Sequence, residues 1–284
     1  MPELPEVEIV KKNLEDKLKK QTIVFAKCHR ETLRIPLSNS LSTHIIGARM
    51  MIFTRRGKYI SIELNNQLTI LIHLGMSGKI IINSMENRDK LTPAKHEHFT
   101  LLTKEGYSVH YIDARRFGLI DLYNSSEVHP LLRKMGPEPL VSSQALDKLC
   151  SELKKRANAS KVPIKNLLLD QHIIAGLGNI YVCEALFLAK ISPLRRFNTL
   201  SDLEILKLIK AIQSVLKQAI HAGGSSMRDY VHADGKKGNF QFCWYVYNRE
   251  NQFCKRCLKF GKSNFIKRVK QSGRSSFYCE YCQH

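Results

Sequence analysis

Two pairs of closely spaced cysteines near the carboxyl end limit what this chain can fold into more than any other feature. Cys254 and Cys257 form one Cys-x-x-Cys motif, Cys279 and Cys282 form another, and 21 residues separate the pairs. Two such motifs supply four thiolates, the ligand set of a structural zinc ion. Two disulfides or a redox-active pair are the alternatives, but a doubled motif in a reducing compartment is a poor disulfide framework. We therefore expect one structural Zn²⁺.

The other four cysteines stand singly in apolar stretches, at Cys28, Cys150, Cys183 and Cys243. Such positions are typical of reduced thiols in the core of a cytosolic protein. The opening residues MPELPEVE lack the basic segment and apolar run of a signal peptide, and no apolar run of about 18 residues occurs. We expect a monomeric cytoplasmic protein with no membrane segment.

The chain is strongly basic, with 45 Lys and Arg against 25 Asp and Glu and a net charge of +20. This excess predicts attraction to a polyanion, and nucleic acid is the commonest polyanion in a cell. A basic protein without such a partner is the alternative. Many cations lie between the zinc cysteines, more than a four-thiolate zinc requires for charge balance. The aromatic residues among them are expected to form the core of a zinc-tied hairpin: Phe260, Phe265, Phe277 and Tyr278.

The pattern of apolar residues divides the chain into a β-rich part and a helical part. Residues 22–123 contain short β-branched runs separated by Asn, Gly and Pro, which predicts an antiparallel sandwich or barrel. Later residues follow a helical period, most clearly after a capping box formed by Ser201 and Glu204. We expect an α+β chain with a β-rich domain at 1–128, a hinge at 129–141, a helical domain at 142–248 and a zinc finger at 249–284.

The opening segment predicts an amphipathic helix with one buried face, because Val7, Val10 and Leu14 recur at helical spacing. Removal of Met1 would leave Pro2 with a free secondary amine. An α-amine has a pKa of about 7.7–8.0, so a fraction is nucleophilic at neutral pH. An ordinary surface helix with acidic residues at its positive end is the alternative.

Several motifs then occur in an order that resembles a known family. They are PELPEVE at the start, GKYI at 57–60, HLGMSG at 73–78, KHEH at 95–98, DARRFG at 113–118, MGPEPL at 135–140, IKNLLLDQHIIAGLGNIY at 164–181 and the terminal cysteine pairs. Over nearly its whole length the chain resembles bacterial formamidopyrimidine-DNA glycosylase. The LPEVE opening favours this family over its relative endonuclease VIII.

The resemblance implies a bifunctional enzyme that removes oxidised purines, such as 8-oxoguanine and formamidopyrimidines, from double-stranded DNA. It then cuts the backbone by β,δ-elimination. Pro2 matches the nucleophile that forms a Schiff base with the sugar, and Glu3 matches the acid/base carboxylate, with Glu6 in support. Lys58 matches a lysine for proton transfer and phosphate contact, and Arg274 an arginine for the final elimination. The resemblance also implies a bacterial, nucleoid-associated protein with an N-terminal β-sandwich and helix, a helix-two-turns-helix domain and a zinc-finger hairpin.

DNA contacts follow from the same resemblance. Residues matching those that fill the gap left by the extruded base are Met76, Arg115 and Phe117. Residues matching phosphate contacts are His96, Lys161 and Asn179, the last at the start of a helix. Residues 224–239 match the flexible lid over the extruded base.

The chain departs from the family pattern in three places. Asn248 and Asn251 stand where glycine is usual, Ser160 stands where a basic residue is common, and the finger is longer just after Cys257. Two rival functions remain. One is an endonuclease VIII-like enzyme that prefers oxidised pyrimidines. The other is a noncatalytic zinc-ribbon protein that binds DNA and does not need Pro2 or Glu3.

Overall fold

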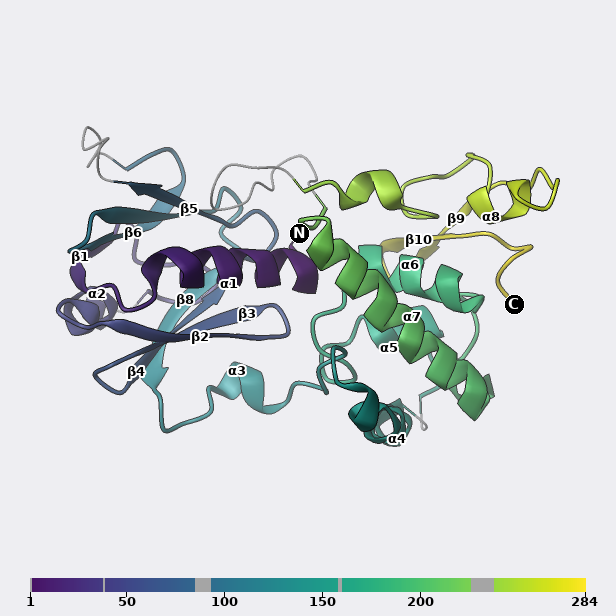
Figure 1. The fold of residues 1–284 in the computed structure, drawn as a ribbon, viewed down its shortest axis with the longest axis horizontal. Helices are drawn as coiled ribbons and strands as arrows, with labels where there is room; N and C mark the ends of the chain where they lie inside the picture. The colour runs from purple at the N-terminus through teal and green to yellow at the C-terminus, as the bar shows by residue number, and fades with distance from the viewer. Residues whose placement is uncertain (1, 38, 85–92, 158–159, 226–237) are drawn as a thin grey trace. The chain divides into compact units, whose positions relative to one another are not determined.

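The computed structural model describes residues 2–37, 39–84, 93–157, 160–225 and 238–284. The chain forms two compact units (Figure 1). The first comprises Met1–Arg133 and Ala222–Gln241, and the second comprises Lys134–His221 and Phe242–His284. The segment at 222–241 thus returns to the first unit after the helices of the second.

The first unit is a β-sandwich with an N-terminal helix, as predicted. One antiparallel sheet has the order β1 (Ile23–Cys28), β6 (Glu97–Thr103), β7 (Tyr107–Ile112), β5 (Lys79–Ser84). The other has the order β2 (Met50–Arg56), β3 (Tyr59–Leu64), β4 (Leu68–His73), β8 (Leu119–Asn124). Short helices α2 (Asn39–Ile45) and α3 (Pro130–Arg133) complete the unit. Both sheets contribute to one apolar core.

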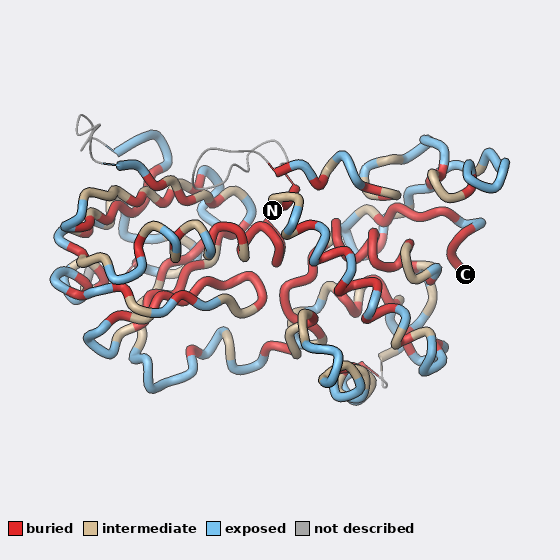
Figure 2. The backbone as a smooth tube through the Cα atoms, in the orientation of Figure 1, coloured by how far each residue is buried: buried red, intermediate tan, exposed pale blue. Residues whose placement is uncertain are grey.

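Helix α1 (Leu4–Leu18) carries the predicted buried face. Val7, Val10, Leu14 and Leu18 are each 1% exposed and join the core of the sandwich. Burying each such side chain stabilises the fold by about 1.5–3 kcal/mol. Figure 2 shows buried residues recurring along this helix between half-buried and exposed ones. The position of the N-terminus is therefore set by packing of the whole helix.

The second unit is helical and ends in a small hairpin. Its helices are α4 (Leu146–Ala157), α5 (Ile164–Leu168), α6 (Asn179–Ala189), α7 (Asp202–His221) and α8 (Lys255–Leu258), and its strands are β9 (Lys267–Gln271) and β10 (Arg274–Tyr278). The predicted capping box begins α7, because the Ser201 amide donates to the Glu204 carboxylate at 2.8 Å and the Glu204 amide donates back to Ser201 Oγ at 3.3 Å. No helix in the described ranges is long and apolar enough to cross a membrane.

A buried carboxylate on α6 holds the chain that leads into the hairpin. Glu184 is 1% exposed and accepts hydrogen bonds from the backbone amides of Tyr245, Val246 and Tyr247 at 2.8, 2.9 and 2.8 Å. Three consecutive amides donate to one carboxylate, and the Arg249 guanidinium donates to Tyr245 O at 2.6 Å in the same stretch. The hairpin is therefore anchored to α6 before its first cysteine.

The predicted core of the hairpin is half wrong. Phe277 and Tyr278 are buried, but Phe260 and Phe265 are 75% and 51% exposed. The four cysteines themselves occupy much of the core, together with apolar residues of α6 and of the hairpin. Because little apolar volume remains to be filled, the ring of Phe265 instead stacks on Phe253 with centroids 4.7 Å apart.

The single cysteines also differ in part from expectation. All of them are free thiols, but only Cys183 is buried, while Cys28 and Cys150 are half-buried and Cys243 is exposed. The prediction of four core thiols was therefore wrong for Cys243. Its short 3₁₀ turn, η4 (Phe240–Cys243), buries Phe240 alone.

The two asparagines that were expected to depart from the family pattern adopt a backbone conformation that suits this residue type. Asn248 and Asn251 have φ angles of 54° and 61°, in the left-handed region. Asparagine enters this region more readily than other residues with a side chain. The chain path here is therefore kept although glycine is absent.

His73, at the end of β4, gives the stability of the first unit a predictable pH dependence. Its Nδ1 accepts a hydrogen bond from the Gly75 amide at 3.0 Å. Burial, with smaller effects of the Arg34 and Lys58 charges, lowers the pKa of His73 from 6.5 to about 4. Between these values the unfolded chain binds a proton that the folded chain does not, so stability falls as pH decreases. The loss approaches about 3 kcal/mol near pH 4.

The substitution His73→Asn tests whether His73 causes this pH dependence of stability. The asparagine amide oxygen can replace Nδ1 as the hydrogen-bond acceptor, and it does not titrate. Denaturant unfolding from pH 7 to pH 4 should show a steeper loss of stability for the wild type than for His73→Asn, by about 3 kcal/mol. Parallel curves for the two proteins would contradict the assignment of a neutral His73.

Candidate functional site

The residues predicted to perform the chemistry begin at the first turn of α1. Pro2, Glu3 and Glu6 are all buried. Glu3 caps the helix, and its amide donates to Glu6 Oε2 at 2.9 Å while its own side chain accepts from the Glu6 backbone. Acidic groups at the N-terminus of a helix are stabilised by its dipole. The capping box thus fixes the backbone that carries Pro2 and Glu3.

The other oxygen of Glu6 reaches a segment far away in the sequence. Oε1 accepts a hydrogen bond from the Ser225 amide at 2.8 Å. The neighbouring Gly224 has a φ of +75°, and a Cβ on it would lie 3.1 Å from the same oxygen. Glu6 therefore connects the start of α1 to the first stem of the predicted lid. No sequence motif predicts that Ser225 is the partner of Glu6.

The predicted lid itself lies largely outside the described residues, which resume after residue 237. Its two stems meet, because Ser225 and Asn239 form a β-bridge and the Phe240 amide donates to Gly224 O at 3.0 Å. A Cβ on Gly238 would lie 2.2 Å from Gly223 O, so glycine is required at this approach. The ends of the segment are therefore fixed independently of what lies between them.

Lys58 follows the turn between β2 and β3. Taken alone, a lysine at such a turn is expected to be solvated, but Lys58 is only 7% exposed. Its charge contributes to the lowered pKa of His73, after burial and Arg34. Keeping an ammonium largely out of water requires polar partners. Its placement differs from that of an ordinary surface lysine.

Two loops of the first unit are joined by Asp113, whose role the sequence analysis missed. The side chain is fully buried. It accepts from Ser77 Oγ at 2.5 Å and from the Gly118 amide at 2.8 Å, and the Arg115 amide donates to Ser77 Oγ at 3.0 Å. The HLGMSG and DARRFG motifs are therefore one structure. The signal was present, since Asp113 begins the second motif.

These two loops carry the three residues predicted to fill the gap in the DNA. Met76 is 41% exposed and Phe117 is 48% exposed, and the exposed Arg115 places its guanidinium 4.9 Å from the centre of the Phe117 ring. Gly75 allows the loops to meet, because a Cβ there would lie 2.4 Å from the Phe117 carbonyl carbon. Exposed apolar side chains beside an arginine suit insertion between base steps.

His96 lies on a third loop, which is linked to the same structure. It is exposed and has a φ of 65°. Its carbonyl accepts from the Asp113 amide at 2.9 Å, and the next residue, Glu97, accepts from the Ala94 amide at 2.9 Å. Hydrogen bonds from Thr100 and His110 outweigh burial and lower the pKa of Glu97. An ionised Glu97 therefore holds the loop that presents His96.

In the second unit, Asn179 and Arg274 are linked through one carbonyl. Asn179 Nδ2 donates to Ser275 O at 2.9 Å, and the fully buried Lys165 donates to the same oxygen at 3.0 Å. Burial lowers the pKa of Lys165. Arg274 is exposed and follows a tight turn in which Gly273 has a φ of 78°. Two donors thus hold the strand that presents Arg274.

Lys165 was missed by the sequence analysis, and its signal was weak: one lysine within the apolar run IKNLLL. Lys161, which was predicted, is exposed just before α5. Over the described residues it takes part in no hydrogen bond or ion pair. Its exposed side chain is compatible with contact to a phosphate, but no interaction in the described ranges connects it to the other predicted site residues.

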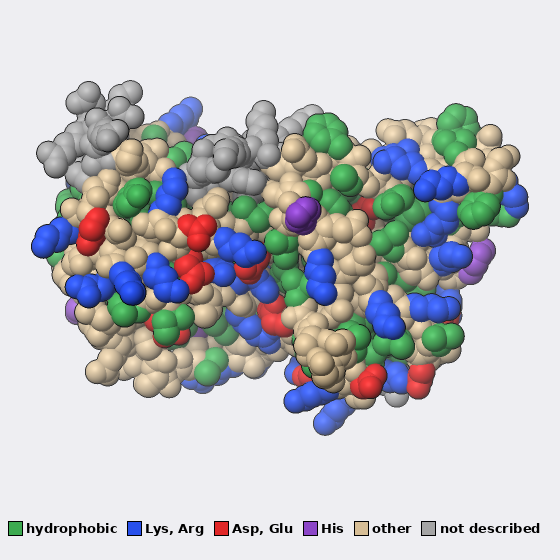
Figure 3. Space-filling model, viewed as in Figure 1, with side chains coloured by type: hydrophobic (Ala, Val, Ile, Leu, Met, Phe, Trp, Pro, Cys, Tyr) green, Lys and Arg blue, Asp and Glu red, His purple; other side chains and the backbone are tan. Residues whose placement is uncertain are grey.

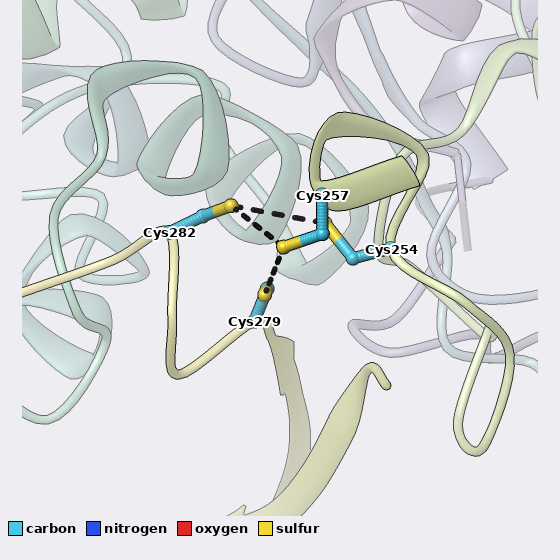
Figure 4. Close-up of side chains that lie close together, drawn as sticks. All are labelled: Cys254, Cys257, Cys279 and Cys282. Atoms are coloured by element: carbon cyan, nitrogen blue, oxygen red, sulfur yellow. Dashed lines mark hydrogen bonds between the residues drawn. The ribbon is translucent and has the colours of Figure 1, made fainter. Parts of the chain in front are cut away.

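The four predicted metal ligands come together. Cys254, Cys257, Cys279 and Cys282 are buried, and their sulfur atoms all lie within 4.8 Å of one another. Figure 4 shows the thiols pointing toward a common centre, two from the turn that carries α8 and two from the chain after β10. Sulfur separations of 3.4–3.8 Å match those of a tetrahedral ion with Zn–S bonds of about 2.3 Å. The cluster can bind a metal ion.

Comparison with known proteins gives one consistent result. Residues 1–120 match the formamidopyrimidine-DNA glycosylase N-terminal domain, and residues 135–231 match the formamidopyrimidine-DNA glycosylase H2TH domain. The formamidopyrimidine-DNA glycosylase of Dinoroseobacter shibae is 46% identical over 290 residues, and that of Gluconobacter oxydans is 44% identical over 285. Each match covers 100% of both chains.

Solved structures agree with the sequences. The wild-type Lactococcus lactis Fpg bound to DNA containing N7-benzyl-Fapy-dG is similar with a TM-score of 0.86 at 33% identity. The Lactococcus lactis Fpg bound to DNA containing an abasic site is similar with a TM-score of 0.86 at 32% identity. Both matches cover 100% of each chain. The chain belongs to the formamidopyrimidine-DNA glycosylase family.

Proposed function

We propose that this chain is a base-excision-repair enzyme that removes oxidised purines from duplex DNA and cleaves the backbone at the resulting abasic site. The observation that carries the proposal is the buried Pro2–Glu3 pair, held by a capping box, in a chain that matches this glycosylase family over its full length. The similar solved structures contain damaged DNA, which supports DNA as the substrate.

The chemistry begins at the Pro2 nitrogen, once Met1 has been removed. Its lone pair forms a bond to the sugar C1′, and the damaged base leaves with the electrons of the glycosidic bond and takes up a proton. The Pro2 nitrogen then loses its proton, and the sugar ring opens as the C1′–O4′ bond breaks and O4′ takes up a proton. The resulting cationic iminium is an electron sink that makes a 2′ hydrogen acidic. Loss of that proton expels the 3′ phosphate, and a second elimination expels the 5′ phosphate. Glu3, beside the nucleophile in sequence, is the group that transfers protons.

The other predicted residues have supporting roles in the proposal. Lys58 supplies a charge close to the reacting sugar and its phosphate, and Arg274 assists the final elimination. Met76, Arg115 and Phe117 replace the extruded base in the stack. His96, Lys161 and Asn179 contact phosphates. Extruding a base costs a few kcal/mol, which these contacts offset.

The metal is proposed to be one structural Zn²⁺. Four buried thiols at tetrahedral spacing are the donor set that zinc prefers over hard cations. Bound zinc would supply the folding energy of the hairpin that carries Arg274. Free thiols throughout and a chromosomal substrate support the cytoplasm as the place of action.

The Pro2 amine can be tested directly by borohydride trapping on DNA containing 8-oxoguanine. The mature protein should become covalently attached, because reduction converts the iminium into a stable amine. A form that retains Met1 has an amide nitrogen at Pro2, whose lone pair is delocalised, so trapping and cleavage should both vanish.

The trapping experiment also distinguishes the proposed function from the two rival functions, a noncatalytic DNA-binding protein and an endonuclease VIII-like enzyme. A noncatalytic DNA-binding protein would not be trapped in either form, and undiminished cleavage by the Met1-retaining form would remove Pro2 from the mechanism. An endonuclease VIII-like enzyme would also be trapped, but it would process thymine glycol faster than 8-oxoguanine paired with cytosine.

Glu3→Gln should lose base release while retaining some cleavage of a preformed abasic site.

Because Glu6 accepts hydrogen bonds from the amides of Glu3 and Ser225, its substitution is predicted to slow base release selectively. Glu6→Gln retains the size of the side chain but removes the charge from an acceptor of two backbone amides. Such charge-assisted bonds contribute about 1.5–3 kcal/mol, so single-turnover release of 8-oxoguanine should fall by about tenfold or more. Glu8→Gln, on the same helix, is the matched control and should remain near wild type. Equal effects of the two substitutions would refute a specific role of Glu6.

The metal assignment is tested by replacing one cysteine. Cys279→Ser should lose bound zinc and DNA cleavage, because three thiolates no longer close the site, while the sandwich stays folded on its own core. Cys243→Ser removes an exposed thiol outside the cluster and should retain one zinc per chain. Metal analysis with circular dichroism measures both. Full activity of Cys279→Ser without metal would overturn the assignment.

A further inference from the structure

The second unit contains a pocket that the proposed chemistry does not use. Its volume is about 300 Å³, at the lower end of the range for small-ligand sites. It lies where α8 and the following turn meet the end of α6. The lining residues are Leu188, Lys190, Tyr245, Lys255, Arg256, Lys259 and Phe260.

The pocket carries four cations and no carboxylate. In the described ranges of the chain, none of the four forms an ion pair, whereas other cations of this unit do, such as Arg268 with Glu250. Lys255 Nζ donates to Trp244 O at 2.9 Å, and Arg256 donates to Phe187 O at 3.0 Å. These two cations are thus oriented by backbone carbonyls, and Lys255 also interacts electrostatically with the buried carboxylate of Glu184. Such a site favours an anionic ligand.

Aromatic rings accompany the cations. Phe260 is 75% exposed and is held in place by a turn in which its amide donates to Cys257 O at 2.9 Å and Gly261 has a φ of 68°. Tyr245 stacks on Phe187 at 5.4 Å, and the Arg256 guanidinium lies 4.2 Å from the centre of the Phe187 ring.

The pocket is separate from the phosphate contacts proposed for this unit. Asn179 begins α6, whereas Leu188 and Lys190 lie at its other end. At about 1.5 Å per residue, the two ends of this helix are roughly 15 Å apart. Figure 3 shows Lys and Arg side chains interleaved with hydrophobic ones over α8 and the end of α6.

We propose that this pocket is a second nucleic-acid site, which holds an unpaired DNA strand by its phosphates and by one base stacked on Phe260. Cations beside an exposed ring are the usual composition of single-strand sites, where stacking contributes about 1–3 kcal/mol per base. An acidic peptide would also satisfy the charges. It gives no reason for an exposed ring beside the cations, so the strand is the better match.

The test uses the full-length zinc-loaded protein, saturated with a duplex that contains a tetrahydrofuran abasic analogue. A short fluorescent oligothymidylate is then titrated, and its anisotropy reports binding outside the lesion site. The wild type should bind it. Lys190→Asn with Lys259→Gln should weaken binding by about tenfold, because two phosphate contacts are lost. Asparagine is chosen at position 190 because the backbone there is left-handed, with a φ of 62°.

The matched control is Lys207→Gln with Lys210→Gln, which removes two exposed charges from α7 in the same unit. It should bind oligothymidylate like the wild type. Phe260→Ala should weaken binding about fivefold or more without any change of charge. Each variant should retain one zinc, which shows that the hairpin is folded.

Three results would overturn the proposal. One is failure of the saturated wild type to bind oligothymidylate, and another is an equal loss of affinity in both double variants, which would indicate general charge attraction. Displacement of the oligonucleotide by an equimolar oligoglutamate peptide would identify an acidic protein segment as the better ligand.

Discussion

Buried carboxylates that accept backbone amides hold the functional loops of this protein. Glu6 joins the start of α1 to Ser225, Asp113 joins two motifs of the sandwich, and Glu184 fixes the chain that enters the hairpin. A charged acceptor strengthens each bond to about 1.5–3 kcal/mol, and an amide donor adds no side-chain entropy cost. These three anchors define loop positions that apolar packing alone would leave free.

The sequence predicted those features of the fold that depend on the pattern of residues within one helix or strand. The buried face of α1, the strands of the sandwich and the capping box of Ser201 all follow from periodicity within a few residues, and they were confirmed. Long-range partners carry no such signal. Ser77 and Asp113 are 36 residues apart, and Lys165 and Ser275 are 110 apart, so only the fold brings them together. The family motifs identified the candidate site, but not the groups that hold it.

The zinc hairpin shows why amino-acid composition alone is a poor guide to which residues form the core of a very small unit. Aromatic residues between cysteines were assigned to a core, yet Phe260 and Phe265 are exposed. A cluster of four sulfur atoms already occupies the centre of such a unit, and α6 supplies Cys183 and Phe187 from one side. The metal ligands and one neighbouring helix leave little interior for further rings. Those rings then become surface features, available for contacts with another molecule.

Contacts at Gly223, Gly224 and Gly238 fix the ends of the predicted lid but place no constraint on the sequence between them. These contacts fix the two ends of the segment between Ser225 and Gly238, and Glu6 ties the first of these ends to α1. The intervening segment can therefore change in length or composition without moving the N-terminal residues. Under the proposed function, selection on the accepted bases can act between these stems while the chemistry proposed for Pro2 and Glu3 stays constant.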